Sequence, residues 1–274
     1  ADNIWDYSRD DIPEAWRLIG EDPRDDVRAP QFAQLVRAFM PDVLDLQEYS
    51  LHMHQRFYPL IRRYGYRIAY EGEEPWNNTP IFYNPETVEL VDVNYVLYAP
   101  SCWSNIGSKS YTSAVFRKKD TGRLFAVVNT HLWWKSEAAQ PGSTYARAAQ
   151  VRLMMAEAEV LKNKYGCTIF VTGDMNAYED SLPIRQFIEG GYTPCYKAAT
   201  DATDNGNGHH ICGPKDGYSR TSRRRSPDRE KGAIDHCFIY NAQEGVAVKV
   251  FDCITARFTV KLTDHYPYLI DAAL

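Results

Sequence analysis

A short polar motif after one apolar run is the first candidate for chemistry in this chain. Residues 169–172 read Ile-Phe-Val-Thr, a β-branched and aromatic run that predicts a buried strand. Gly173 then lets the backbone turn, and Asp174 and Asn176 follow two residues apart. A carboxylate and an amide at a strand end suit water activation and oxyanion binding. Taken alone, the motif is more typical of an Asx turn, in which both side chains cap their own backbone.

Other polar side chains stand at the ends of further predicted strands, where open α/β sheets place their chemistry. Taken singly, each has a structural explanation, such as a turn residue, a cap or a core histidine. Their joint placement favours a single site. They are Asn3, Glu48, His131, Asp235, Asp264 and His265.

Carboxylates, amides and imidazoles without a cysteine partner are hard ligands, and they predict Mg²⁺ or Mn²⁺ rather than zinc. The six cysteines show no C-x-x-C spacing, which argues against a structural zinc site. Cys195 and Cys212 flank a polar loop and are candidates for a disulfide if the protein is exported. A metal, a positioned water and imidazole donors together predict a phosphoester hydrolase.

The composition is that of an ordinary globular protein, with 274 residues, 44% hydrophobic and 24% charged. A net charge of −5 argues against tight, non-specific wrapping of a polyanion. No apolar run approaches the roughly 20 residues of a membrane span. Because Ala1 stands close to the end of a predicted strand, we expect an upstream segment. We expect residues 1–274 to form one catalytic domain and a monomer, with export favoured over a cytoplasmic location.

Helical and strand patterns alternate along the chain, with no internal repeat. Residues 200–231 contain almost no apolar side chain, and so long a loop in a compact domain is usually functional or mobile. Arg147 and Gln150 lie within one turn of the best long helix and are interpreted as structural. Helices are predicted around 32–39, 57–64, 151–161 and 184–188, and strands at 42–47, 80–83, 88–98, 113–117, 124–129, 169–172, 233–240, 246–254 and 266–270.

Six short segments in this order resemble the endonuclease/exonuclease/phosphatase superfamily, which includes the pancreatic-type deoxyribonuclease and the abasic-site endonucleases. Each is weak alone, but together they run from the first residues nearly to the last. The resemblance implies an α/β (α+β) fold, a four-layer sandwich of two packed mixed β-sheets flanked by helices. The segments begin at Asn3 (Asn-Ile-Trp), Leu46 (Leu-Gln-Glu), Asn129 (Asn-Thr-His-Leu), Gly173 (Gly-Asp-Met-Asn), Ile234 (Ile-Asp-His) and Thr263 (Thr-Asp-His-Tyr-Pro).

The resemblance also implies a metal site and a nucleophile. Asn3 and Glu48 would hold the divalent metal, with Asp264 near a second position. Asp174 would orient and activate the attacking water. Asn176 would hold a phosphate oxygen.

Two imidazoles would complete the implied site. His265 would contact the phosphate, with Asp235 fixing its tautomer and charge, and His131 would be the second imidazole. In the secreted deoxyribonucleases an acidic residue supports the first histidine. Residues 77–79 read Asn-Asn-Thr here, so we expect His131 to lack that partner. The Ile-Asp-His motif also departs from the usual pattern, and packing is favoured for His236 over a place in the site.

Candidate substrate contacts are less specific. Trp133 and Trp134 could stack on a base or sugar, or could form a hydrophobic lid, and the sequence favours neither. Arg223 lies in an arginine cluster that could clamp phosphate, although a solvated basic loop is favoured. His209 could reach the site or bind metal adventitiously, and the structural reading is favoured.

Two functions remain. The first is a Mg²⁺- or Mn²⁺-dependent phosphodiesterase, nuclease or phosphatase that hydrolyses its substrate without a covalent intermediate. Its substrate would be a nucleic acid or a small phosphorylated molecule. The second is a catalytically silent relative that binds a phosphorylated ligand or a protein partner in the same cleft. The intact set of Glu48, Asp174, Asn176, Asp235 and His265 speaks against the second.

Overall fold

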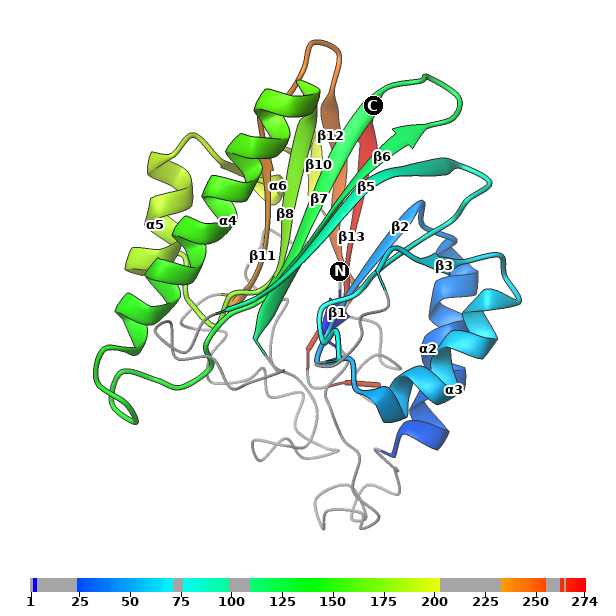
Figure 1. The fold of residues 1–274 in the computed structure, drawn as a ribbon, viewed down its shortest axis with the longest axis horizontal. Helices are drawn as coiled ribbons and strands as arrows, with labels where there is room; N and C mark the ends of the chain where they lie inside the picture. The colour runs from blue at the N-terminus through cyan, green and yellow to red at the C-terminus, as the bar shows by residue number, and fades with distance from the viewer. Residues whose placement is uncertain are drawn as a thin grey trace.

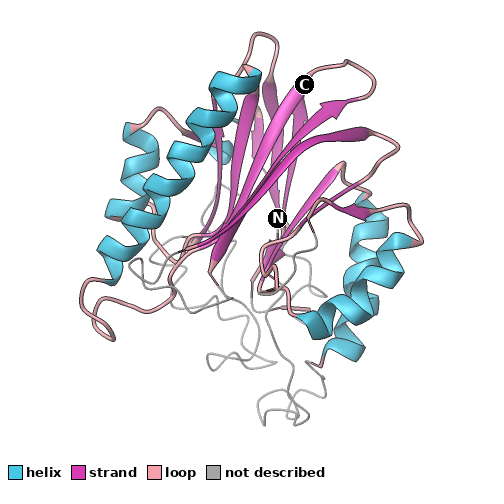
Figure 2. Cartoon of the chain, viewed as in Figure 1, coloured by secondary structure: helices cyan, strands magenta, loops and turns pink. Residues whose placement is uncertain are grey.

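A computed structural model describes residues 2–3, 24–70, 76–98, 109–202, 233–254, 262–263 and 265–274. Two β-layers face each other and helices cover both outer faces (Figures 1 and 2). Helices α4 (Ser143–Tyr165) and α5 (Leu182–Glu189) cover one layer, and α2 (Asp25–Phe39) and α3 (Leu51–Arg62) cover the other. The predicted four-layer sandwich of mixed sheets and helices is therefore confirmed.

The first layer is a six-stranded sheet in the order β5-β6-β7-β8-β11-β9. Neighbouring strands are antiparallel except β7 and β8, which are parallel and are connected through α4. A parallel pair needs a long crossover of this kind, which explains why the longest helix lies between them. The strands are β5 (Val88–Leu97), β6 (Ser110–Lys118), β7 (Leu124–His131), β8 (Thr168–Asp174), β9 (Thr193–Pro194) and β11 (Asp235–Tyr240).

The second layer consists of two smaller sheets, ordered β1-β2-β4-β3 and β10-β12-β13. The short helix α6 (Cys195–Ala198) connects β9 to β10. Strand β1 runs parallel to β2, and its register sets Asn3 beside Gln47. The strands are β1 (Asp2–Asn3), β2 (Val43–Gln47), β3 (Arg67–Ile68), β4 (Ile81–Tyr83), β10 (Asp201–Ala202), β12 (Ala247–Cys253) and β13 (Tyr268–Ala273).

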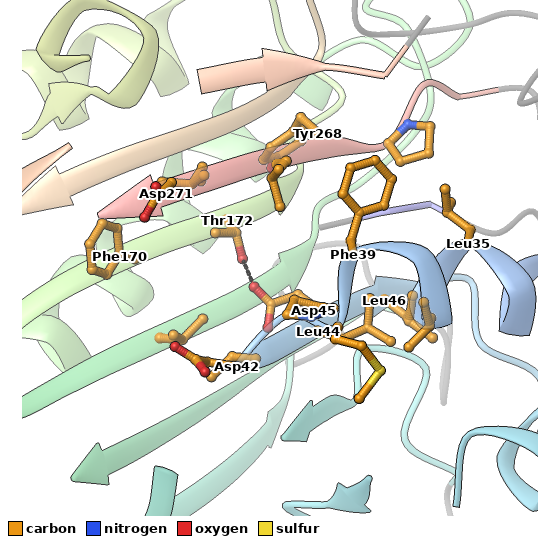
Figure 3. A pocket seen from close by; sticks show the side chains of 18 of the residues that line it. Leu35, Phe39, Asp42, Leu44, Asp45, Leu46, Phe170, Thr172, Tyr268 and Asp271 are labelled. Carbon is orange, nitrogen blue, oxygen red and sulfur yellow. Dashed lines mark hydrogen bonds between the residues drawn. The ribbon is translucent and has the colours of Figure 1, made fainter. Parts of the chain in front are cut away.

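A largely apolar cavity of about 430 Å³ lies between β2 and β13, and α2 also lines it (Figure 3). Thr172 and Asp45 supply polar atoms at its wall, where Thr172 Oγ1 donates a 2.8 Å hydrogen bond to Asp45 Oδ2. Burial raises the pKa of the Asp45 carboxyl above its usual range. Among the described strand-end residues, Glu48, His131, Asp174, Asp235 and His265 do not line this cavity.

Apolar side chains fill the space between the layers and beneath the helices. Strands β7 and β8 are buried along almost their whole length because they lie at the centre of their sheet, with α4 on one face and the second layer on the other. Burying a single Phe or Val in this way contributes roughly 1.5–3 kcal/mol. This packing makes the ends of β7 and β8 rigid. No helix among the described residues has the length and apolar character needed to cross a membrane.

Candidate active site

Three strand ends of the six-stranded sheet, those of β7, β8 and β11, lie at its lower edge in Figure 1. The β7–β8 register pairs His131 with Asp174, and the β8–β11 register pairs Asp174 with Asp235. Residues directly opposite each other on neighbouring strands project from the same face and lie within contact distance. The strand pairing thus explains why three residues so far apart in the sequence form one row.

His265 lies over this row and binds to one end of it. Its Nδ1 lies 2.7 Å from Asp235 Oδ2, and its Nε2 lies 3.9 Å from Asp174 Oδ2. His131 Nε2 is 3.5 Å from the same Asp174 oxygen. All four side chains are buried. A hydrogen bond from Nδ1 to a carboxylate fixes the orientation of the ring and leaves Nε2 directed at Asp174.

Asp174 divides its two oxygens between a backbone turn and the site. Its Oδ1 accepts a 2.8 Å hydrogen bond from the Asn176 backbone N–H, so the Asx-type contact considered from the sequence is present. Its Oδ2 faces the two histidines. Asn176 Nδ2 donates to Leu132 O at 3.2 Å. The structural and functional interpretations of this motif are therefore compatible, because each uses a different carboxylate oxygen.

Glu48 and Asn176 both have a positive φ, 54° and 47° respectively. Such a conformation is uncommon for residues with a side chain, and it is found preferentially at functional sites. Glu48 Oε1 lies 3.9 Å from His131 Nε2, and its side chain is 28% exposed, so this carboxylate is accessible from outside.

Lys109 is a charged residue of the site that the sequence did not identify. It is 5% exposed, and its Nζ lies 2.5 Å from His131 Nε2. Burial lowers the pKa of Lys109 to about 8, against an opposing pull from the carboxylates of Glu48 and Asp174. Lysines are rarely buried, and a single lysine before a strand carries no signal of this role.

His131 is neutral in this environment. Burial, reinforced by the Lys109 ammonium, lowers its pKa to about 4. Among the described residues its Nδ1 has no hydrogen-bond partner. Asn77 instead donates to Tyr70 O and Thr112 Oγ1. In the described chain Asn77 therefore makes other contacts, and Lys109 places a positive charge beside His131.

The segment after His131 is held by α4. Arg147 donates to the carbonyls of Trp133 and Lys135, and Gln150 accepts from the Trp133 backbone N–H. These contacts confirm the structural interpretation of both polar residues. The Trp133 ring is buried, and its Nε1 donates to Ser143 Oγ, whereas Trp134 is 54% exposed. The exposed ring of the tryptophan pair is therefore Trp134.

The remaining sequence candidates are only partly visible. His236 is buried, donates from Nε2 to Ala177 O at 2.8 Å and stacks on Phe238, which confirms that it packs. For Asn3 the structure describes the strand and not the side chain. Asp264, Arg223 and His209 lie outside the described residues.

Comparison with solved structures shows the same fold in several proteins of low sequence identity. A mannosyl-6-phosphatase from Bacteroides thetaiotaomicron superposes with a TM-score of 0.73 at 18% identity, covering 100% of this chain and 98% of that one. The human Nocturnin catalytic domain with bound sulfate gives 0.65 at 19%, covering 90% and 86%. TDP2 from D. rerio, complexed with a single-strand DNA product, gives 0.65 at 15%, covering 100% and 97%.

A comparison with curated protein sequences finds no match. The family model described as the Endonuclease/Exonuclease/phosphatase family matches residues 18–265, which is most of the chain. That span contains Glu48, His131, Asp174, Asp235 and His265. The chain belongs to the endonuclease/exonuclease/phosphatase family.

Proposed function

We propose that this protein hydrolyses a phosphoester by attack of a water molecule, with the help of a divalent metal and without a covalent intermediate. One observation carries the proposal: Asp174 Oδ2 lies 3.5 Å from His131 Nε2 and 3.9 Å from His265 Nε2, and Asp235 holds His265 at 2.7 Å. A carboxylate between two nitrogen groups on rigid strand ends can orient a water and place it against a phosphorus atom.

The described side chains divide the work by charge. Asp174 accepts the proton of the attacking water. His265, paired with Asp235, donates from Nε2 to a phosphoryl oxygen as negative charge develops there. Because His131 is neutral, the fixed positive charge beside it comes from Lys109, whose ammonium favours an anionic substrate. We propose that the side-chain amide of Asn176, two residues after Asp174, holds another phosphate oxygen.

The donor set fits a hard cation. Glu48, Asp174 and Asp235 offer carboxylate oxygens close to the two histidines. The carboxylates of Glu48 and Asp174 raise the pKa of the buried Lys109 ammonium, against the effect of burial. We propose that Glu48 and Asn3 hold Mg²⁺ or Mn²⁺, with Asp264 near a second position. Among the described residues, Asp174, Asp235 and His265 form a further group whose ligand atoms lie within 4.8 Å of one another. The metal would polarise a phosphoryl oxygen.

The substrate class stays broad in this proposal. The solved relatives named above include a sugar phosphatase and a DNA-bound protein, and their identity of 15–18% carries the fold alone. The exposed Trp134 lies on the segment that follows His131, with Lys135 Nζ 5.6 Å from its ring centroid. A ring of this kind could stack on a base or on a sugar. Both nucleic acids and small phosphorylated molecules are therefore included.

A substrate panel tests the proposal directly. A bis-aryl phosphodiester, an aryl phosphomonoester, sugar phosphates and single-stranded DNA would each be incubated with Mg²⁺ or Mn²⁺, and then with EDTA. We expect metal-dependent turnover of at least one, lost with EDTA and restored by excess metal. Tight binding of a phosphorylated ligand without turnover of any would instead identify a silent relative.

A further inference from the structure

Two cysteines from separate segments meet between the two β-layers. Cys237 lies on β11, and Cys195 directly follows β9. The antiparallel register pairs Pro194 with Phe238, so the next position places Cys195 opposite Cys237. Their Sγ atoms are 3.0 Å apart, and both thiols are buried. Cys237 is therefore a candidate disulfide partner for Cys195, although the two residues lie 42 positions apart in the sequence.

The geometry at this pair is close to that of a disulfide. Directly opposed residues on antiparallel strands have Cα atoms roughly 4.5–5.5 Å apart, within the range that a disulfide spans. Bond formation would bring the two sulfurs closer by only about 1 Å. Burial raises the pKa of the Cys237 thiol well above its usual range, and the neighbouring Cys195 thiol adds to the rise. In the folded state the reactive thiolate is therefore disfavoured, and the bond would form while the chain folds.

We propose that Cys195 and Cys237 form a disulfide that fastens β9 and the start of α6 to β11. Strand β9 is an edge strand that pairs with β11 over only two residue pairs, so this edge has little other backbone support. The bond would lie two residues from Asp235, on the strand that positions His265. It needs an oxidising compartment, where such bonds persist.

The Cys195–Cys237 bond would form by thiol–disulfide exchange. The Cys195 and Cys237 thiols lose two protons and two electrons and form one Sγ–Sγ bond. The electrons reduce one disulfide of a dithiol–disulfide oxidant, such as oxidised glutathione, to two thiols. The proposal does not depend on the hydrolase activity.

Differential alkylation of the full chain tests the pairing. The protein would be refolded with oxidised and reduced glutathione, denatured with iodoacetamide before and after reduction, digested and analysed by mass spectrometry. We expect Cys195 and Cys237 to be labelled only after reduction, and their two peptides to be linked before it. Labelling of both before reduction would overturn the proposal, as would linkage of Cys195 to Cys212, the pairing considered from the sequence.

Thermal unfolding provides the second measurement. Reduction should lower the Tm of the wild type by roughly 10 °C, since the bond closes a long loop. Cys237→Ala should remove this sensitivity to reductant. Cys167→Ala, a change at a buried cysteine in another part of the core, should keep both the linked peptides and the shift. A shift that persists in Cys237→Ala would show that the reductant acts elsewhere and would contradict the stabilising role.

Discussion

Gln47 Nε2 donates a 2.6 Å hydrogen bond to Asn129 Oδ1, and this bond joins the two β-layers beside the site. Gln47 directly precedes Glu48, and Asn129 lies two residues before His131. Asn129 Nδ2 in turn donates to the carbonyls of Leu46 and Pro80. One buried pair of amides therefore connects the residue before Glu48, in the second layer, to the strand of the first layer that ends at His131.

Replacing Gln47 with Met should loosen this connection. The change keeps the side-chain volume but leaves the buried Asn129 Oδ1 without its donor, at a cost of about 1–3 kcal/mol in unfolding free energy. We also expect kcat to fall roughly 10-fold or more, because small displacements of catalytic groups are costly. Chemical denaturation and steady-state kinetics measure both effects. Gln34→Met, at an exposed position of α2, should change neither; wild-type kinetics in Gln47→Met would show that the amide pair does not position Glu48.

Replacing Asp174 with Asn should abolish turnover and leave the fold intact. The amide keeps an oxygen that can accept the Asn176 N–H but cannot take a proton from water, so we expect a loss of at least ~10³-fold in kcat/KM. Circular dichroism and thermal unfolding would check the fold. The matched control is Asp180→Asn, an exposed carboxylate on the same connection. Near-normal activity in Asp174→Asn would refute the role assigned to Asp174.

The sequence predicted the row of strand ends for a definite physical reason. Strands β7 and β8 are buried on both faces, so each contains a continuous apolar run. Each run is followed by the polar residues that lead to His131 or Asp174. The strands predicted at 113–117 and 124–129 correspond to β6 and β7, which pair antiparallel. The helix predicted at 151–161 begins earlier, at Ser143. The apolar pattern does not indicate this start, because the first two turns bury polar side chains such as Arg147 and Gln150.

What the sequence could not predict depends on contacts between distant segments. The buried ammonium of Lys109 interacts electrostatically with the carboxylates of Glu48 and Asp174. No local sequence pattern around Lys109 predicts these distant partners. The division of the tryptophan pair into a buried Trp133 and an exposed Trp134 depends on Ser143 and Gln150 of α4. The sequence offers Cys212 as a partner for Cys195, and Cys212 lies outside the described residues. The register of β9 and β11 places Cys195 against Cys237.

The low pKa of Lys109 predicts an alkaline limit to activity. Below about pH 8 the ammonium is charged and favours an anionic substrate; above it the charge is lost, so kcat/KM should fall as the pH rises. Lys109→Arg keeps the charge at all accessible pH values, and it should move this decline to higher pH. Profiles of kcat/KM between pH 6 and 10 would show the shift, with Lys135→Arg as the control. An unchanged alkaline limb in Lys109→Arg would assign it to another group.

Among the glycines of the described chain, we expect replacement of Gly173 to be the most damaging to stability and to the geometry of the site. Its φ is 133°, and a Cβ there would lie 2.0 Å from the carbonyl oxygen of Thr130 on the neighbouring strand. Gly173→Ala must therefore push β7 and β8 apart at the point where they present His131 and Asp174, and we expect a loss of more than about 4 kcal/mol in stability. Gly65→Ala tests backbone strain without a steric clash, because Gly65 also has a positive φ, 95°, but has open space around it. That control should lose only about 1–2 kcal/mol. Equal destabilisation of the two variants in urea denaturation would show that backbone strain, and not the close approach of Thr130, is what requires glycine at position 173.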